Sequence, residues 1–391
     1  MKMKEMCVLL TRIRLQSRHV GVKTASNQWM NMMRSALLCL AILISSALPA
    51  FAKERVYYVA AQDVIWDYAP SQDNQMMGRE FSEDEQVFAA KSASTIGSTY
   101  KKTLYIEYTD ASFNTVKERD SDWAHLGFLG PVFHAEVGDT IKVIFKNKSD
   151  RPYSIHPHGV FYEKSSEGAR YNDGTSGNDL LDDAVQSGET YIYQWEVRER
   201  AGPGPKDPDS IAWLYHSHVS GIQDPSTGLI GAMIITRKGA ADTLGRPRDV
   251  AREFINVFWV TDESLSWHAD KNAEPLGQIE DTDAFEEGNL MHNINGYIYG
   301  NIPDLRLKEG EKSRWYLFGF GSEVDLHTPH WHGNTVLWDG RRADTIDLLP
   351  ASHKIVDMTP DAPGTWMYHC HVNDHISAGM TALYHVLPAN E

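Results

Sequence analysis

A repeated stretch of sequence decides the fold of this chain: residues 366–371 read WMYHCH, and residues 213–218 read WLYHSH. The alternating aromatic residues predict a β-strand, on which neighbouring side chains point to opposite faces. Cys370 therefore faces away from His369 and His371, so one tripeptide can reach two metal centres. His375 and Met380 follow it, and two His with one Cys and a weak Met form a blue-copper ligand set. The alternative for this stretch is a reactive thiol beside chance histidines.

The repeat extends upstream of these strands. Residues 156–159 read HPHG and residues 330–333 read HWHG, each after a turn and a strand. Period-two apolar alternation recurs along the chain, as at Ile141, Val143 and Phe145, and the runs 230–235 and 315–320 are also strand-like. Sustained helical periodicity is scarce, so we predict an all-β fold. The repeat predicts two copies of one β-sandwich, at about 53–238 and 250–391, with a linker over 237–252.

The two copies differ at the positions that matter for a metal. Ser217 stands where Cys370 stands, and no His or Met follows it at the matching offsets. Only the second copy can therefore build a blue-copper site. The H-x-H pairs occur four times, two in each copy, and imidazole ligands suit copper.

The N-terminal 52 residues read as an export signal. Arg34 precedes an apolar run over 36–48, and residues 50–52 (AFA) form a small-x-small cleavage site, so we expect a mature chain of 53–391 that is secreted or periplasmic and has no membrane span. Cys7 and Cys39 would leave with the signal, which makes an intrachain disulfide impossible. Residues 1–52 hold seven Lys or Arg and one Glu, a net of +6, so the formal net charge of −16 becomes about −22 in the mature chain; such an acidic protein repels nucleic acid and attracts cations.

Several further motifs carry a resemblance to a known family. They are YYVAA at 57–61, WDYAP at 66–70, LGFLGP at 126–131, GVFYEKSSEG at 159–168 and DLHT at 325–328. With the four histidine clusters, they make the chain resemble the multicopper oxidases, and more closely the ceruloplasmin and hephaestin branch. It looks like a bacterial member with two domains in place of the six in the animal proteins. The resemblance implies two tandem cupredoxin-like Greek-key β-sandwich domains, the second carrying the type 1 copper.

The resemblance also implies the ligands of four copper ions. The type 1 copper would take His327, Cys370, His375 and axial Met380. The type 2 copper would take His156 and His330, and the type 3 pair would take His158, His216, His218, His332, His369 and His371. The resemblance implies that one-electron oxidation of a substrate at the type 1 copper drives four-electron reduction of O2 to water at the other three. It further implies a homotrimer with this three-copper cluster between subunits. The other histidines, at 125, 134, 268, 353 and 385, we expect to be structural or on the surface.

The substrate is less directly encoded. In the ceruloplasmin branch an Fe(II) site lies beside the type 1 copper, and Glu287, His292 and Asp374 match its residues, which suggests a ferroxidase. Oxygen ligands with one imidazole suit iron. Asp173 matches an acid near the copper cluster of relatives that supplies protons, although an Asp-Gly turn also explains it. The alternatives are a laccase-like oxidase of phenols or aromatic amines, a copper electron-transfer protein, and a two-domain copper nitrite reductase.

Overall fold

The computed structural model describes residues 52–390 apart from residues 304 and 324, and these residues belong to one compact unit. The predicted export signal lies outside the described residues, except for its last residue, Ala52. None of the described helices is both long enough and apolar enough to cross a lipid bilayer.

We call the part of the structure up to β8 the first half and the part from β9 onward the second half. The eight described strands of the first half form two sheets. The first sheet has the order β2 (Thr99–Tyr108), β1 (Glu54–Asp67), β4 (Thr140–Asn147) and β6 (Thr190–Glu196). The second has the order β3 (Phe133–Glu136), β8 (Ile230–Thr236), β7 (Ser210–His216) and β5 (His156–Pro157).

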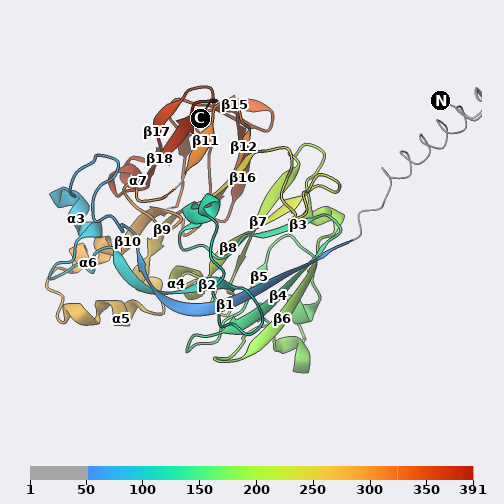
Figure 1. The fold of residues 1–391 in the computed structure, drawn as a ribbon. Coiled ribbons are helices and arrows are strands. Elements are labelled where there is room, and N and C mark those ends of the chain that lie inside the picture. Colours follow the sequence, from blue (N-terminus) through green and yellow to red (C-terminus); the bar gives the residue numbers. More distant parts are fainter. Residues whose placement is uncertain (1–51, 304, 324, 391) are drawn as a thin grey trace, which may run out of the picture. The chain divides into compact units, whose positions relative to one another are not determined.

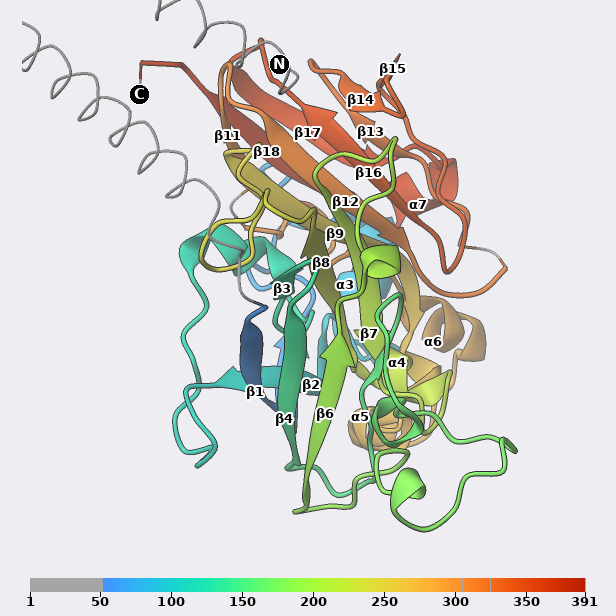
Figure 2. The same cartoon turned by 90° about the vertical axis from the view of Figure 1, so that its right-hand side faces the viewer.

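The second half also forms two sheets. The larger has the order β10 (Leu290–Ile294), β9 (Arg252–Asp262), β12 (Ser313–Gly319), β16 (His353–Met358), β14 (Val336–Trp338) and β15 (Arg341–Ala343). The smaller has the order β11 (Arg306–Lys308), β18 (Thr381–Leu387), β17 (Gly364–Cys370) and β13 (Pro329–Trp331). Figures 1 and 2 show β1–β8 gathered on one side of this unit and β11–β18 on the other.

The pairing of strands repeats between the halves. The pair β1 and β4 is parallel, as is β9 and β12, and β3 with β8 is parallel, as is β11 with β18. The register repeats as well, because His156 lies opposite His216 and His330 lies opposite His369. The all-β prediction and the sequence repeat are therefore confirmed in three dimensions. The division into domains at 238 and 250 follows this grouping of strands and stays a prediction.

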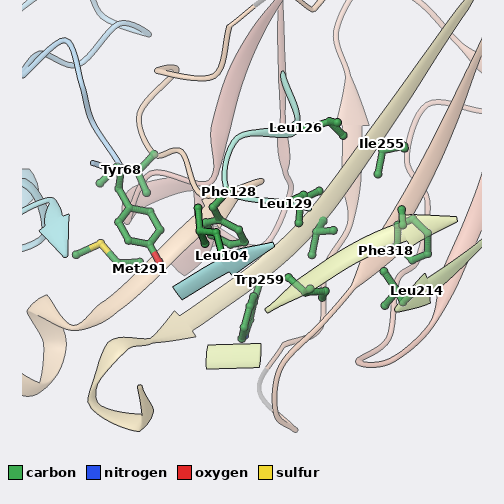
Figure 3. Packing of buried hydrophobic residues seen from close by; sticks show 14 of the residues in the cluster. Tyr68, Leu104, Leu126, Phe128, Leu129, Leu214, Ile255, Trp259, Met291 and Phe318 are labelled. Carbon is green, nitrogen blue, oxygen red and sulfur yellow. The ribbon is translucent and has the colours of Figure 1, made fainter. Parts of the chain in front are cut away.

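The sheets stack because their middle strands are apolar on both faces. In β7, Ile211 and Tyr215 pack into the core of the first half, whereas Ala212 and Leu214 pack toward the second half. The strands β9 and β12 alternate in the same way, with Phe318 among the side chains that face β7 and β8. The residues between the two halves form a continuous hydrophobic cluster (Figure 3). Because side chains alternate between the two faces of a strand, each of these three strands contributes to two hydrophobic cores.

Short helices lie in the connections between strands. They are α3 (Glu83–Ala89), α4 (Gln223–Thr227), α5 (Ala269–Ala273), α6 (Thr282–Gly288) and α7 (Asn373–Ser377). Figure 1 shows α3 beside α6, although α3 ends at Ala89 and α6 begins only at Thr282. The helix α7 follows the end of β17, and α4 follows the end of β7, so in each half a short helix comes a few residues after the H-x-H tripeptide.

Candidate metal centres

The second half brings a thiol and two imidazoles together at the end of β17. The distance from Cys370 Sγ to His375 Nδ1 is 3.4 Å and to His327 Nδ1 is 3.9 Å, and the two Nδ1 atoms lie 3.2 Å apart. All three donor atoms lie within 4.8 Å of one another. Met380 is fully buried in the same hydrophobic cluster as Cys370, and its backbone N–H donates to the carbonyl oxygen of His375. One sulfur and two nitrogens that converge in this way match the donor set that copper prefers.

The protonation of this group fits a metal site. Burial lowers the pKa of His375 to about 4, so its imidazole is neutral at pH 7 and offers a lone pair. Burial raises the pKa of the Cys370 thiol, while the backbone N–H of Thr328 donates to the sulfur at 3.4 Å. A bound metal would have to displace the thiol proton, as metal thiolate sites do.

Asp325 is a buried acid beside this site that sequence reasoning did not assign. Its Oδ1 lies 3.3 Å from His327 Nε2 and accepts a 2.7 Å hydrogen bond from the backbone N–H of Val260. His327 Nε2 has no hydrogen-bond partner within the described part of the chain. The signal was present in the DLHT motif, but only the fold shows that this acid is buried against the ring of His327.

The first half gathers four imidazoles, His156, His158, His216 and His218, which we call the first quartet. Five of their six ring pairs have centroids 5.2 to 5.7 Å apart, and the Nε2 atoms of His158 and His216 lie 3.2 Å apart. His156 Nδ1 donates to the carbonyl oxygen of Glu167 at 2.7 Å, and His216 Nδ1 donates to that of Ser217 at 2.9 Å. Because a carbonyl only accepts, these bonds place the ring proton on Nδ1 and leave Nε2 as a lone-pair donor.

The second half gathers a matching group, His330, His332, His369 and His371, which we call the second quartet. The same five ring pairs recur with centroids 4.9 to 5.4 Å apart, and the Nε2 atoms of His332 and His369 lie 3.1 Å apart. His330 Nδ1 donates to the carbonyl oxygen of Asp344 at 2.9 Å, and His369 Nδ1 donates to that of Cys370 at 2.7 Å. Burial lowers the pKa of His369 to about 4 and that of His216 to about 3, so both stay neutral ligands at pH 7.

The two quartets form separate groups among the residues that the structure describes. Among residues 52–390 as described, every ring contact between these eight histidines joins members of one quartet. The structure thus brings together the four histidines of each quartet, and the three-copper cluster they would form stays a prediction.

Two of the three residues predicted to bind iron, His292 and Asp374, lie together beside the thiol site. His292 lies on β10 and is buried, and its ring lies 5.3 Å from that of His375. The distance from His292 Nε2 to Asp374 Oδ2 is 3.7 Å. Burial lowers the pKa of His292. The negative charges of Asp374 in α7 and of Glu287 in α6 oppose that shift. The Asp374 carboxylate and a neutral His292 imidazole therefore lie next to His375, and Glu287 is near enough for its charge to act on His292.

Asp173 lies in a polar loop that reaches the first quartet. Its Oδ2 pairs with Lys164 Nζ at 2.8 Å, and Lys164 also bonds Glu167, whose carbonyl oxygen holds His156. Hydrogen bonds from Lys164 and Thr175 hold the pKa of Asp173 well below its usual range. At neutral pH this side chain is therefore a carboxylate and accepts hydrogen bonds.

The remaining histidines join none of these groups among the described residues. His125 is fully buried, where Ile255 N–H donates to its Nε2 at 3.2 Å and burial lowers its pKa to about 3. His268 Nε2 lies 2.9 Å from Thr103 Oγ1, and the ring of His353 packs against Trp213. Such contacts are those of structural side chains.

Comparison with known proteins agrees with this geometry. Two multicopper oxidase family models match residues 106–240 and 269–390. The chain belongs to the multicopper oxidase family. Within it, the chain falls in the ceruloplasmin and hephaestin branch.

Three human proteins illustrate the relationship. The chain is 43% identical to hephaestin over 85% of its own length, 41% identical to ferroxidase HEPHL1 over 85%, and 38% identical to ceruloplasmin over 88%. These matches span only 29%, 29% and 32% of the respective relatives, so the chain covers under a third of each. A solved structure of a multicopper oxidase superposes with a TM-score of 0.54 at 19% identity, covering 87% of this chain and 91% of that one, which supports the cupredoxin-like β-sandwich fold.

Proposed function

We propose that this chain is an exported multicopper oxidase that oxidises Fe(II) and reduces O2 to water. Copper bound at the donor sets described above would supply the redox chemistry, taking up single electrons and delivering four of them to O2. The type 1 ligands would be His327, Cys370, His375 and Met380, and the two quartets would hold the type 2 and type 3 ions.

The observation that carries the proposal is the connection made by the tripeptide at residues 369–371. The side chain of Cys370 lies in the thiol site, while its two neighbours lie in the second quartet. His369 Nδ1 also donates to the carbonyl oxygen of Cys370 at 2.7 Å, which adds a hydrogen-bonded link to the covalent one. A single electron-transfer protein would need only the first site, and a nitrite reductase would not need two quartets.

The iron specificity rests on Glu287, His292 and Asp374. The ring of His292 lies against that of His375, a proposed type 1 ligand, so an Fe(II) ion bound by this group would be adjacent to the thiol site. The carboxylates would hold the cation, and the neutral imidazole would fix its position. The match to a relative named ferroxidase supports this substrate.

The separation of the quartets supports assembly of several chains. If each quartet supplies half of the ligands of one three-copper cluster, a second copy must bring its first quartet against the second quartet of this one. Such a contact joins two different surfaces and closes as a ring, for which we propose a homotrimer. Diluting the copper-loaded protein below its assembly concentration should abolish O2 uptake but leave the blue absorption, because the thiol site lies within one chain. A blue monomer with full O2 uptake would contradict the trimer.

We propose that the Asp173 carboxylate begins a path along which protons reach the first quartet. Its position beside Lys164 and Glu167 supports this role, while its lowered pKa argues that it passes protons on instead of storing one.

Steady-state O2 uptake by the copper-loaded mature protein tests the proposed function. Fe(II) and then 2,6-dimethoxyphenol serve as donors, with copper measured per chain. Fast turnover of Fe(II) and slow turnover of the phenol is the expected result. The reverse result would make this chain a laccase-like oxidase, and one copper ion per chain without O2 uptake would make it an electron-transfer protein.

A further inference from the structure

The first half keeps the shape of the thiol site but none of its metal donors. The strand β7 ends at His216 as β17 ends at Cys370, and a short helix follows each strand. At the positions of Cys370, His375 and Met380, the first half has Ser217, Ile222 and Thr227. The question is what holds the first quartet in place there.

A buried hydrogen-bond network occupies this location. Ser217 Oγ donates to Asp224 Oδ2 at 2.6 Å, and the backbone N–H of Ser220 donates to the same oxygen at 3.0 Å. Trp267 Nε1 donates to Asp224 Oδ1 at 2.8 Å. Ser217 is 0% exposed and Asp224 is 1% exposed. The carboxylate is satisfied on both oxygens, as a buried charge must be.

The network extends to the backbone that carries the imidazoles. Ser217 lies between His216 and His218, and its carbonyl oxygen accepts the Nδ1 proton of His216. The hydroxyl of Ser217 also accepts the backbone N–H of Ser154 at 3.1 Å. Ser154 Oγ in turn accepts the backbone N–H of His218 at 3.0 Å. Both histidines of the second H-x-H pair are thus fixed from the Ser217 side.

The same network reaches the other H-x-H pair. Ser154 Oγ donates to the carbonyl oxygen of Gly168 at 2.6 Å, and the preceding carbonyl, that of Glu167, accepts the proton of His156. Gly168 has φ +69°, and a Cβ there would lie 2.3 Å from the carbonyl oxygen of Ile155, so the loop packs directly on the strand that carries His156. Three of the four rings therefore rely on backbone that this network orders.

We infer that Asp224, acting through Ser217, is a positioning residue for the first quartet, and that the Ser217–Asp224–Trp267 network does there what the copper donor set does in the second half. This inference rests on the proposed function, because it takes the first quartet as copper ligands. Trp267 lies in the second half of the chain, and the guanidinium of Arg151 stacks on it at 3.6 Å. The network therefore also ties the quartet to the segment 263–289, beyond the linker.

The test compares Asp224→Asn and Ser217→Ala with Ser217→Thr, which keeps the hydroxyl. In the wild type, Ser217 and Trp267 donate to different oxygens of Asp224. An Asn side chain has only one acceptor oxygen, so Asp224→Asn loses the hydrogen bond from Ser217 or the one from Trp267. The matched control is Asp139→Asn, because Asp139 is also buried in the first half and accepts three hydrogen bonds, from Lys53, Arg55 and Glu136. Urea unfolding of each variant gives conditions in which all are folded to the same extent.

The readouts are copper per chain and the share of bound copper that gives an EPR signal. A magnetically coupled copper pair is EPR-silent, so misplaced ligands raise the detectable share. We expect Asp224→Asn and Ser217→Ala to raise that share and to lower copper affinity or O2 turnover about 10- to 100-fold, the range typical of residues that orient metal ligands. The blue absorption of the second half should stay unchanged. Ser217→Thr and Asp139→Asn should behave like the wild type.

Two results would overturn the inference while leaving the proposed function intact. One is wild-type copper coupling in Asp224→Asn, and the other is an equal loss of coupling in Asp139→Asn at the same folded fraction. A wild-type protein without any EPR-silent copper would instead refute the proposed function, and the inference with it.

Discussion

Neutralising Glu287 or Asp374 should raise KM for Fe(II) and leave KM for a phenol unchanged. The Asp374 side chain is 83% exposed, so its interaction with a cation is screened as in water. Two unit charges about 4 Å apart in water gain about 1 kcal/mol, and a doubly charged ion therefore gains about 2 kcal/mol. Because about 1.4 kcal/mol corresponds to a factor of ten, Asp374→Asn should raise KM for Fe(II) about 30-fold.

The assay is steady-state O2 uptake at low ionic strength with Fe(II) and with 2,6-dimethoxyphenol. Glu287→Gln should give a change of similar size, since Glu287 is also exposed. Glu286→Gln is the matched control, because it removes the same charge from the neighbouring position of α6. The effect should shrink as salt is added. Unchanged KM for Fe(II) in both Asp374→Asn and Glu287→Gln, or an equal change with the phenol, would refute the iron site.

Three further outcomes follow from the geometry. Cys370→Ser should remove the blue absorption and all O2 uptake at a stability cost of about 1–3 kcal/mol, because a hydroxyl replaces sulfur in an apolar core; absorption spectra and urea unfolding check it, and surviving blue colour would contradict the site. The copper-free protein should lose stability as the pH falls from about 6.5 toward 4, because His216, His369 and His375 have folded pKa values of about 3 to 4 and the unfolded chain then binds more protons. Each contributes about 1 kcal/mol by pH 5.5, and equal urea midpoints at pH 7.5 and 5.5 would disprove this. Gly159→Ala and Gly333→Ala should each lower the free energy of unfolding by about 1–3 kcal/mol. Both glycines have positive φ, and an added Cβ would lie 2.3 Å from Trp213 and 2.5 Å from Trp366, respectively. An unchanged urea midpoint in either variant would show that the repeated turn is not under this constraint.

The part of the fold that depends on local pattern was readable from the sequence. Alternation over Ile141, Val143 and Phe145 predicted a strand, and these residues lie in β4. The same holds for 230–235 in β8 and for most of 315–320 in β12. Strand periodicity is visible in the sequence because each strand must bury one or both faces. The repeated H-x-H motifs are visible because each quartet consists of two such pairs, each on one strand end or turn.

The sequence alone also predicted that three of the four proposed type 1 ligands lie close together. Cys370, His375 and Met380 span only eleven residues, roughly one strand end, a turn and a short helix, so local geometry brings them together. His327 lies 43 residues earlier, and its assignment came from the family resemblance until the structure placed its Nδ1 3.9 Å from Cys370 Sγ.

Tertiary structure decided what depends on contacts between distant segments. It buried Asp325 beside His327, and it brought Trp267 across to Asp224 in the first half. It also stacked the sheets so that Leu214 and Phe318 share one core. Finally, among the described residues it kept the rings of the two quartets out of contact with each other. The family resemblance implied this separation, but no motif shows it directly, because the packing of two sandwiches leaves no periodic trace in the sequence.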